Sequence, residues 1–524
     1  MRIAIVGLGT AGACMLDSLN QALGSRTDVH LSLYDPTDYP WLGRVFQEDG
    51  DWVLANVPVT AMSIRHGDAA HAESWLAKEG RLGVHRSAET FLPRAVYGRY
   101  ISEHASQLVD DLRHRGWQIE FIKAKATSLN RNGSSGYTVG SEGRRDEHDH
   151  VILCAGGSVL ADPFDLASHE GYVANPYPTR ERLRDIPSDA AVGILGSGLT
   201  AIDAVVALKA HGHTGPVRLY SRSGILPFVR RQGPDWAAEY LTPERIADLS
   251  KSTGQFRLAD LEQLFEQEVL AWGGEPQGLF PPPPVTEPRD WLRRQLQEPH
   301  DPHDLGTFIF QKSVPSVWGD IWYALHPEDK RQLLESPALR DIMSRCCPMP
   351  RVNAEKVLAM LDTGQLEVRK GVQSVCAGAD GFDVQLASTS EHVDYLVNAA
   401  TPSDYGVHPD VRELVDAAVG DGLAKHHAIG GIEVADHSGA IRGVPERCGV
   451  YALGDLTRGA FFFIFGLPAL VRRSADIANA IRGLADEPNP GMRSQGSAEL
   501  SSSMTAVSRS ELSTIPGPFL LQKL

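Results

Sequence analysis

The sequence lacks an excess of basic residues: its 50 Lys and Arg are outnumbered by 66 Asp and Glu, for a net charge of −16. A protein that neutralises phosphates shows the opposite imbalance, so nucleic acid is disfavoured as the main partner. Cysteines at metal-ligand or C-x-x-C spacing are also lacking. The six that occur are Cys14, Cys154, Cys346, Cys347, Cys376 and Cys448. This pattern favours a reducing, cytoplasmic setting and argues against a dithiol disulfide reductase.

Long apolar runs are missing as well. The longest one, residues 461–471, is far shorter than the roughly 20 residues that cross a bilayer, and Gly466 and Pro468 interrupt it. No signal peptide is visible, because the first residues already read as an apolar strand. We therefore expect a soluble, cytoplasmic protein without a membrane partner. Its 524 residues predict two or three domains.

Glycine-rich turns are present twice, each directly after a short apolar strand. The two sets share one spacing: Gly7, Gly9 and Gly12, then Gly196 and Gly198 with Ala201 in the third small position. One glycine makes the tight turn, one lets the backbone approach a pyrophosphate, and the last lets the helix pack on its strand. Each helix then starts at the phosphates, with Thr10-Ala11 or Leu199-Thr200 at its N-terminus. Two such turns predict two dinucleotides, and the usual reason is a flavin reduced by a nicotinamide.

The first turn is followed by an alternating strand, residues 30–35, that ends in Asp35. Asp35 lies 23 positions after Gly12, about where this kind of βαβ unit presents a carboxylate to an adenosine ribose. A carboxylate there disfavours a 2′-phosphate, so the first site is expected to hold FAD or NAD rather than NADP. The alternative is that Asp35 merely ends the strand.

The second turn is followed by a strand that ends differently, in Ser221-Arg222. A hydroxyl and a guanidinium suit a ribose 2′-phosphate, which arginine can bind with two hydrogen bonds. We therefore predict NADPH at the second site, with Arg230 and Arg231 as possible further contacts. The alternative is that Arg222 is an exposed residue of a surface turn.

Three apolar strands that close on small residues lie far apart, at 151–157, 394–402 and 449–456. We interpret them as parts of one nucleotide-binding domain into which another domain is inserted. The prediction is an α/β fold with two Rossmann-like dinucleotide-binding domains and a mostly helical insert. Its boundaries are 1–160 and 365–483 for FAD, 161–364 for NADPH, and 484–524 for a disordered tail. The proline run at 281–284 is expected to be an extended connector.

With these motifs placed, residues 1–482 resemble the FAD/NAD(P)-binding flavoproteins. These are two-dinucleotide oxidoreductases distantly related to glutathione-reductase-type and N-hydroxylating flavoenzymes. Besides the glycine turns, the resemblance rests on segments 54–63, 91–100, 221–227, 398–402 and 454–459. It implies FAD at the first turn, with Asn56, Val57 and Pro58 close to the flavin. It further implies Gly454 and Asp455 at the ribityl or pyrophosphate portion, and NADPH at the second turn.

The function implied is that of an FAD-dependent, NADPH-consuming monooxygenase. It would use molecular oxygen and act on an amine or another small polar metabolite in a bacterial specialised pathway. N-hydroxylation is the reaction that the resemblance to N-hydroxylating flavoenzymes suggests. One alternative is an NADPH-dependent flavin reductase or dehydrogenase that inserts no oxygen. Another is a non-catalytic, redox-responsive flavin-binding protein. The histidine and tryptophan-proline fingerprint of Baeyer–Villiger flavoproteins is absent, which argues against insertion of oxygen into a ring.

No catalytic residue beyond the cofactors is assigned. Arg94 and Arg458 could receive a substrate carboxylate or a cofactor phosphate. His426 and His427 are adjacent without a carboxylate at ligand spacing, so no metal site is predicted. The tryptophans of residues 235–350 are expected in the core more often than around a substrate. Cys346 and Cys347 are interpreted as packing residues.

Overall fold

A computed structural model describes most of the chain. The described residues are 1–80, 91–133, 136–156, 162–233, 236–275, 278–279, 287–297, 305–336, 338–400, 406–435, 438–442, 449–464 and 466–486. The chain divides into Met1–Leu484 and Ala485–Leu524, and the fold described below is that of the first. The predicted connector at 281–284 lies outside the described residues. So does the predicted tail beyond Asp486, the residue at which the last helix ends.

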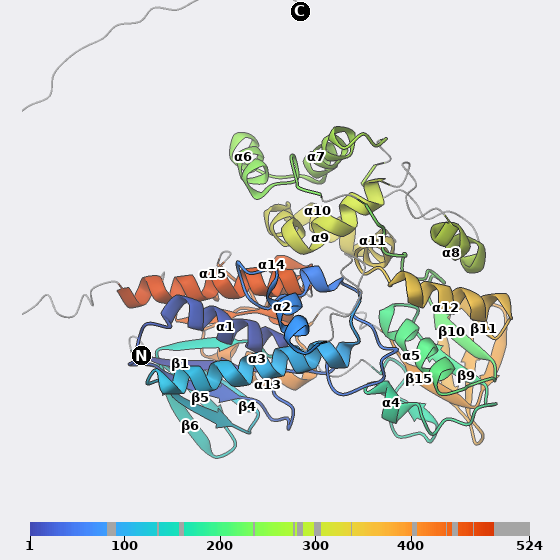
Figure 1. The fold of residues 1–524 in the computed structure, drawn as a ribbon, viewed down its shortest axis with the longest axis horizontal. Helices are drawn as coiled ribbons and strands as arrows, with labels where there is room; N and C mark the ends of the chain where they lie inside the picture. The colour runs from blue at the N-terminus through green and yellow to red at the C-terminus, as the bar shows by residue number, and fades with distance from the viewer. Residues whose placement is uncertain are drawn as a thin grey trace, which may run out of the picture. The chain divides into compact units, whose positions relative to one another are not determined.

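The first sheet has five parallel strands in the order β16-β7-β1-β2-β3. Their bounds are β1 Arg2–Val6, β2 His30–Tyr34, β3 Gln118–Ile122, β7 His150–Leu153 and β16 Val450–Ala452. Ile3 to Val6 are all buried, as expected of a parallel strand that is covered on both faces. Helices α1 (Thr10–Leu23) and α3 (Arg94–His114) pack against each other beside this sheet (Figure 1).

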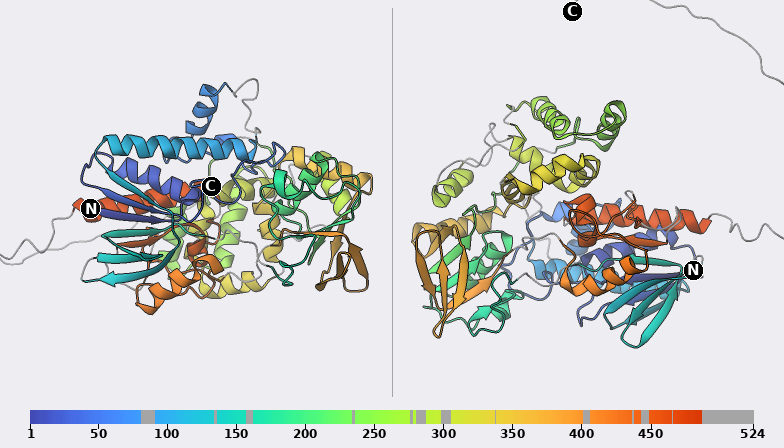
Figure 2. Two further views of the ribbon diagram at one scale, coloured as in Figure 1. Left: turned by 90° about the horizontal axis from the view of Figure 1, so that it is seen from below. Right: turned by 180° about the vertical axis from the view of Figure 1, so that it is seen from behind.

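An antiparallel sheet accompanies the first sheet on the face away from α1 and α3 (Figure 2). It consists of β4 (Ala126–Asn132), β5 (Gly136–Ser141) and β6 (Arg144–His148). The remaining elements of this region are α2 (His71–Lys78), α13 (Pro409–Gly420), α14 (Arg458–Phe461), α15 (Leu467–Asp486) and the 3-10 turns Val59–Ala61 and Gly454–Thr457. Strands from both ends of the described chain therefore build one sheet, as the dispersed apolar strands predict.

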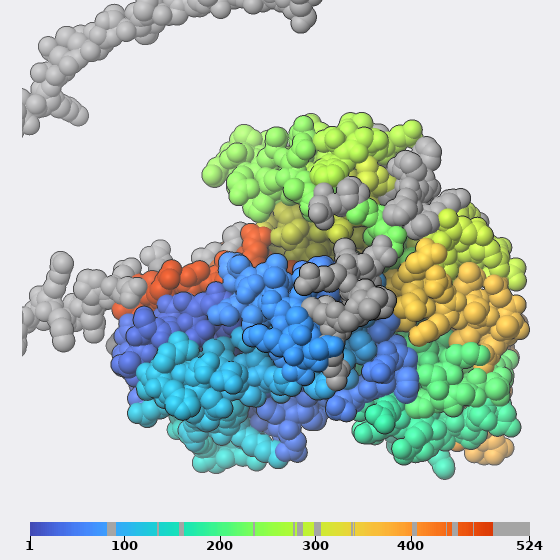
Figure 3. All heavy atoms as spheres, viewed as in Figure 1, coloured from blue at the N-terminus to red at the C-terminus, as the bar shows by residue number. Residues whose placement is uncertain are grey.

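The second sheet also has five parallel strands, in the order β11-β10-β9-β15-β8. They are β8 (Tyr172–Val173), β9 (Val192–Leu195), β10 (Val217–Ser221), β11 (Leu366–Lys370) and β15 (Tyr395–Asn398). The helices nearby are α4 (Thr179–Arg182), α5 (Leu199–Ala210), α8 (Pro288–Gln297) and α12 (Arg351–Asp362), and a small antiparallel sheet is formed by β12 (Ser374–Ala377), β13 (Phe382–Gln385) and β14 (Ser390–Val393). In the space-filling view the N-terminal residues, in blue and cyan, and the residues around the second sheet, in green and orange, occupy separate areas of the face shown (Figure 3).

The position of β15 corrects the predicted boundary at residue 365. The strand within 394–402 was expected in the first sheet, but β15 pairs with β9, and β11 pairs with β10. The reason is that each glycine turn needs a neighbouring strand that ends in small residues. Strand β7 provides this for the first turn and β15 for the second, so similar sequences belong to different sheets. Thr401 and Pro402, which complete that motif, lie outside the described residues.

Helices of the insert form a separate hydrophobic core. They are α6 (Pro243–Thr253), α7 (Leu258–Ala271), α9 (Leu305–Ala324), α10 (Pro327–Glu335) and α11 (Ala338–Cys346). Trp318 and Trp322 are each 3% exposed, and Phe462 and Phe463 join the same cluster. Trp322 stacks on Phe462 with ring centroids 4.6 Å apart. These aromatic side chains therefore belong to the core, as expected for the insert.

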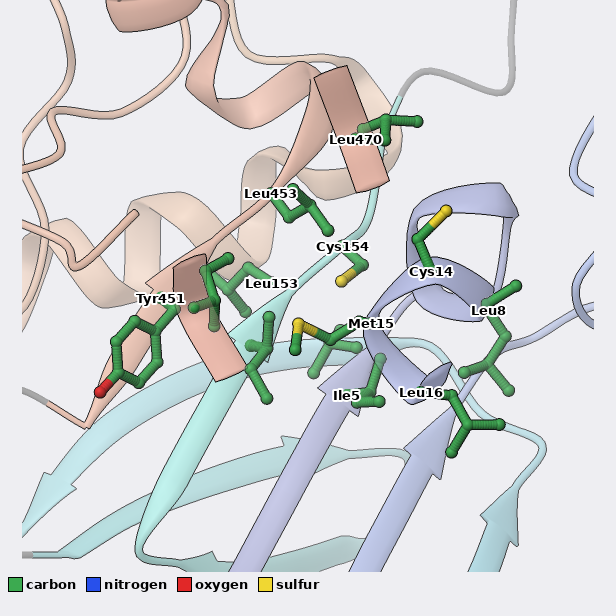
Figure 4. Packing of buried hydrophobic residues seen from close by; sticks show 14 of the residues in the cluster. Ile5, Leu8, Cys14, Met15, Leu16, Leu153, Cys154, Tyr451, Leu453 and Leu470 are labelled. Atoms are coloured by element: carbon green, nitrogen blue, oxygen red, sulfur yellow. The ribbon is translucent and has the colours of Figure 1, made fainter. Parts of the chain in front are cut away.

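The core beside the first sheet explains two of the cysteines. Cys14 on α1 and Cys154 after β7 are buried among Ile5, Met15 and Leu153 (Figure 4). Burial raises the pKa of both thiols above the ordinary value. Both side chains therefore act as small apolar groups of the core.

Candidate dinucleotide sites

The two glycine turns have the same backbone geometry. Gly7 has φ +97° and Gly196 has φ +112°, a region that side chains rarely permit. A Cβ at Gly7 would lie 2.6 Å from the nitrogen of Ala155, and one at Gly196 would lie 2.5 Å from the oxygen of Ala399. Each turn therefore presses against the end of the neighbouring strand, and the fold itself requires glycine at both positions.

The middle glycines of the two turns, Gly9 and Gly198, are not required by the backbone conformation. Gly9 has φ −80° and Gly198 has φ −82°, which any residue can adopt. A Cβ at Gly9 would have only the Gly43 Cα near it, at 3.9 Å, and a Cβ at Gly198 would have nothing within 4 Å. Neither the backbone nor its packing therefore requires glycine here. What the missing side chains leave is open space above each turn, which fits the close approach of a pyrophosphate.

Both helices that follow the turns begin without a cap. Gly9 and Gly198 are the N-cap residues of α1 and α5, no side chain caps either helix, and neither first turn contains an acidic residue. The first backbone N–H groups of a helix have no partner inside the helix, and its positive dipole end attracts anions. Thr10-Ala11 and Leu199-Thr200 are partly exposed there. The residues present thus fit a phosphate group at each turn.

Asp35 is held by the first turn itself. Its Oδ2 accepts a hydrogen bond from Leu8 N at 2.7 Å, and its Oδ1 accepts bonds from Thr37 N at 2.9 Å and Thr37 Oγ1 at 2.6 Å. An ionised carboxylate can accept about four bonds. Three are used among the described residues, which leaves room for one ribose hydroxyl. Asp35 therefore both orders the turn and remains able to bind a ribose.

Gly454 and Asp455 lie at the same end of the first sheet. A Cβ at Gly454 would be 3.8 Å from the Cβ of Ala11, and one at Gly156 would be 3.3 Å from the Cβ of Asp455. Gly157, the next residue of that strand end, lies outside the described residues. The Asp455 side chain pairs with Arg458. The structure thus brings the segment after β16 to the start of α1.

If Asp455 contacts the flavin, Asp455→Ala should weaken flavin retention while NADPH affinity stays nearly unchanged. Losing a hydrogen bond to a charged group costs about 1.5–3 kcal/mol, so we expect at least a tenfold higher dissociation constant for FAD. Flavin content after dialysis and equilibrium binding of NADP⁺ would measure the two effects. An equal loss of both would show that Asp455 only supports the structure.

Two of the segments on which the resemblance rests pair with each other. Ala55 N donates to Leu92 O at 2.9 Å, and Arg94 N donates to Val53 O at 2.8 Å. Asn56, which follows in the same segment, accepts a hydrogen bond from Arg230 Nε at 2.8 Å through its backbone oxygen. Val57 packs partly buried against the first core.

This contact corrects the prediction for Arg230. A side chain that is bound to Asn56 cannot serve the far end of the second site, where a 2′-phosphate was expected. Burial lowers the pKa of Arg230 to about 10. The Arg231 side chain is held elsewhere too, because its Nη1 donates to Gln295 O at 3.4 Å.

Ser221 and Arg222 lie where they were predicted, at the end of β10. Ser221 Oγ accepts from Gly224 N at 2.9 Å and so orders the turn. Ser197 Oγ of the second glycine turn donates to Ile225 O at 2.7 Å, which places this loop beside that turn. Arg222 is exposed and makes no hydrogen bond or ion pair with any described residue. It is therefore free to meet a ligand.

A buried network joins the start of α3 to helix α5. Arg94 forms an ion pair with Asp203 at 2.8 Å and donates to Tyr177 Oη at 2.9 Å, and Tyr177 donates to Asp203. Burial opposes the charge of Arg94, but Asp203 and Tyr177 outweigh it and raise the pKa of Arg94. The Arg94 side chain is therefore fixed inside the protein, which corrects the suggestion that it could receive a substrate carboxylate.

Residues 41–44 were not predicted as part of the site, yet they lie against the first turn. Trp41 N donates to Leu8 O, and the Gly43 Cα faces Gly9. Trp41 has φ +76°, an unusual value for a bulky residue that often marks functional loops. The Arg44 guanidinium lies 5.2 Å from the Tyr177 ring, and its buried Nη1 has no hydrogen-bond partner among the described residues. Such a group fits an anionic ligand. In the sequence, only the glycine at position 43 indicates that residues 41–44 approach the first turn closely.

Neither a metal-binding cluster nor a membrane-spanning helix is found among the described residues. They contain no group of three or more His, Cys, Asp or Glu side chains that could hold a metal ion. In that same part of the chain no helix is long and apolar enough to cross a membrane.

Comparisons with known proteins agree with this geometry. Residues 4–158 match a family model described as FAD-NAD(P)-binding. No curated protein matches the sequence. Among solved structures, the chain is similar to the reduced form of ornithine hydroxylase from Pseudomonas aeruginosa. The TM-score is 0.59 and the identity 11%, over 93% of this chain and 99% of that one.

Two further structures are similar over comparable lengths. An ornithine N-hydroxylase from Kutzneria with reduced FAD, NADP⁺ and L-ornithine gives a TM-score of 0.53 at 15% identity, over 92% of this chain and 99% of that one. An FAD-bound cadaverine monooxygenase from Erwinia amylovora gives a TM-score of 0.55 at 13% identity, over 96% of this chain and 99% of that one. At these identities the likeness is one of fold, and it confirms the predicted α/β architecture. The first part of the chain, residues 4–158, matches the FAD-NAD(P)-binding family and confirms the predicted resemblance over that range.

Proposed function

We propose that the protein is an FAD-dependent, NADPH-consuming monooxygenase that hydroxylates the nitrogen of a small amine. The observation that carries this proposal is the pair of glycine turns, each with open space above its middle glycine and an uncapped helix behind it. Two dinucleotides in one chain are the arrangement that hydride transfer from a nicotinamide to a flavin requires. When bound, FAD supplies the redox and oxygen chemistry, and the chain positions both cofactors.

Each of the two proposed cofactor sites lies at one of the two parallel sheets. In this proposal FAD is bound at Gly7, Gly9, Thr10, Ala11 and Gly12, with Asp35 at the ribose, Asn56 and Val57 near the flavin, and Gly454 and Asp455 beside it. NADPH is bound at Gly196, Gly198, Leu199 and Thr200, with Ser221 and Arg222 at the 2′-phosphate. The strands of the second sheet extend the proposed NADPH domain from about residue 162 to residue 400.

An amine substrate is supported by the solved structures that share the fold over nearly the whole chain. Ornithine and cadaverine, the compounds in their names, are both amines. Since Arg94 is held by Asp203, it does not supply a receptor for a substrate carboxylate.

A screen of diamines and basic amino acids would test the reaction. Purified holoenzyme with NADPH in air should yield a hydroxylamine product from one of them, with NADPH consumption rising at the same time. If NADPH is consumed without an oxygenated product from any amine, and hydrogen peroxide accumulates instead, the reductase alternative holds. A yellow protein that NADPH cannot bleach would indicate the non-catalytic alternative.

Preference for NADPH should depend on Arg222. A charge-assisted bond to a phosphate contributes about 1.5–3 kcal/mol, so Arg222→Ala should raise the apparent KM for NADPH on the order of ten- to a hundredfold. KM for NADH should change little, and flavin content should remain, because FAD is held at the other turn. Steady-state oxidation of both nicotinamides measures this. Equal impairment with both would remove Arg222 as the phosphate contact.

A further inference from the structure

Two adjacent thiols lie within bonding reach of one another at the end of helix α11. The Sγ atoms of Cys346 and Cys347 are 3.5 Å apart, Cys346 is buried, and Cys347 is partly exposed. The other described cysteines lack this arrangement. Cys14 and Cys154 are buried in the core of the first sheet, and Cys376 is exposed on β12. Cys448 lies outside the described residues.

The two thiols have different surroundings. Burial and a hydrogen bond to Cys347 raise the pKa of the Cys346 thiol well above its ordinary value. Cys346 therefore keeps its proton, and its Sγ lies within hydrogen-bond distance of Met343 O, at 3.4 Å, and of the Cys347 sulfur. Cys347 is the more accessible of the two, so a peroxide in solution reaches its sulfur first. These surroundings make Cys347 the nucleophile and Cys346 the partner thiol.

The chain on both sides of the pair is fixed in place. Phe228 N donates to Ser344 O at 3.0 Å, Met349 N donates to Phe228 O at 2.8 Å, and Arg230 N donates to Met349 O at 2.9 Å. Cys346 and Cys347 thus lie between two anchored points. Bringing their sulfurs together from 3.5 Å to the roughly 2 Å of a disulfide needs only local movement.

We propose that Cys346 and Cys347 form a redox-active dithiol that a hydroperoxide closes into a vicinal disulfide. The Cys347 thiolate attacks the O–O bond of hydrogen peroxide, which gives a sulfenic acid at Cys347 and releases hydroxide. The Cys346 sulfur then displaces the hydroxyl group from Cys347, and its proton leaves with that group as water. In sum, two thiols and one peroxide give one disulfide and two waters.

The disulfide should be easily reduced again. Neighbouring Cα atoms are about 3.8 Å apart across a trans peptide, which is less than the roughly 4.4–6.8 Å of ordinary disulfides. A ring closed over that distance is strained, and strained disulfides have the higher reduction potentials. A dithiol such as dithiothreitol should therefore reopen it, whereas a sulfinic or sulfonic acid would resist.

Mass spectrometry of the full-length protein tests the proposal, and added peroxide makes the result independent of the proposed function. Trypsin cuts after Arg345 and Arg351, so the pair lies on the short peptide 346–351. Treatment with an equimolar amount of hydrogen peroxide should make this peptide lighter by two hydrogens, and dithiothreitol should restore its mass. The peptide that holds Cys376 should be unchanged at that stage, which makes Cys376 an internal control.

Two variants separate the roles of the thiols. In Cys346→Ser the Cys347 sulfenic acid should persist and be captured by dimedone, whereas Cys347→Ser should leave Cys346 unmodified. Oxidation of Cys376 before the pair would overturn the proposal. The proposal would also be overturned if Cys347 of the wild-type protein were oxidised to a sulfinic or sulfonic acid, or formed a disulfide with another molecule, and the Cys346–Cys347 disulfide did not form.

Discussion

Replacing Gly9 by alanine is expected to give a folded protein that has lost most of its flavin. The φ of −80° suits alanine, and the new methyl group meets no described protein atom closer than the Gly43 Cα at 3.9 Å. The methyl would instead fill the space proposed for the FAD pyrophosphate. We expect at least a tenfold loss of FAD affinity, equivalent to about 1.4 kcal/mol or more. Flavin absorbance per chain, together with circular dichroism to confirm folding, measures this effect.

The chain provides a matched control in Gly198→Ala. Its backbone angle is nearly the same and its surroundings are open, but it lies at the second turn. This variant should keep its flavin and lose affinity for NADPH by a similar factor. If Gly9→Ala retains its flavin, or if the two variants lose the same cofactor, the assignment of one dinucleotide to each turn is wrong.

Removing Asp203 should cause the largest loss of stability that we expect from a single side chain. Asp203→Ala leaves Arg94 buried without its ion-pair partner at 2.8 Å, and Arg94 is only 8% exposed. Breaking a buried pair in this way costs about 3–5 kcal/mol. The midpoint of urea denaturation should fall accordingly.

Asp290→Ala is the control for that experiment. Asp290 pairs with Arg293 at 3.1 Å, but both side chains are well exposed, at 50% and 38%. Exposed pairs contribute about 0–1 kcal/mol, so this midpoint should hardly move. The double variant Arg94→Ala/Asp203→Ala should cost less than the sum of its single changes, because no unpaired charge remains. Strict additivity would show that the two groups do not interact.

Local patterns of the sequence predict the two turns and the fold around them. The spacing of Gly7, Gly9 and Gly12 and its repeat at residue 196 follow from steric rules that act within a few residues, and the structure places both turns as predicted. Asp35 and Ser221 also lie at the strand ends that their positions in the βαβ pattern imply. What binds at the turns stays a prediction until a cofactor is measured.

Long-range pairings could not be predicted in the same way. The strand β15 resembles β7 so closely that its sequence does not say which sheet it joins, and only its hydrogen bonds to β9 decide this. Arg94 and Arg230 looked like free cations, but the backbone oxygens that they bind, those of Leu54 and Asn56, lie 40 and 174 positions away in the chain. Neither the charge nor the spacing of an arginine reveals such a partner.

Anaerobic titration of the purified protein with NADPH tests the central claim most directly. The account predicts a yellow protein whose visible flavin absorbance is bleached by about one equivalent of NADPH, and much less readily by NADH. Each NADPH delivers one hydride, and one hydride reduces one flavin. A protein that cannot be loaded with FAD, or one whose bound flavin NADPH leaves oxidised, would contradict the account.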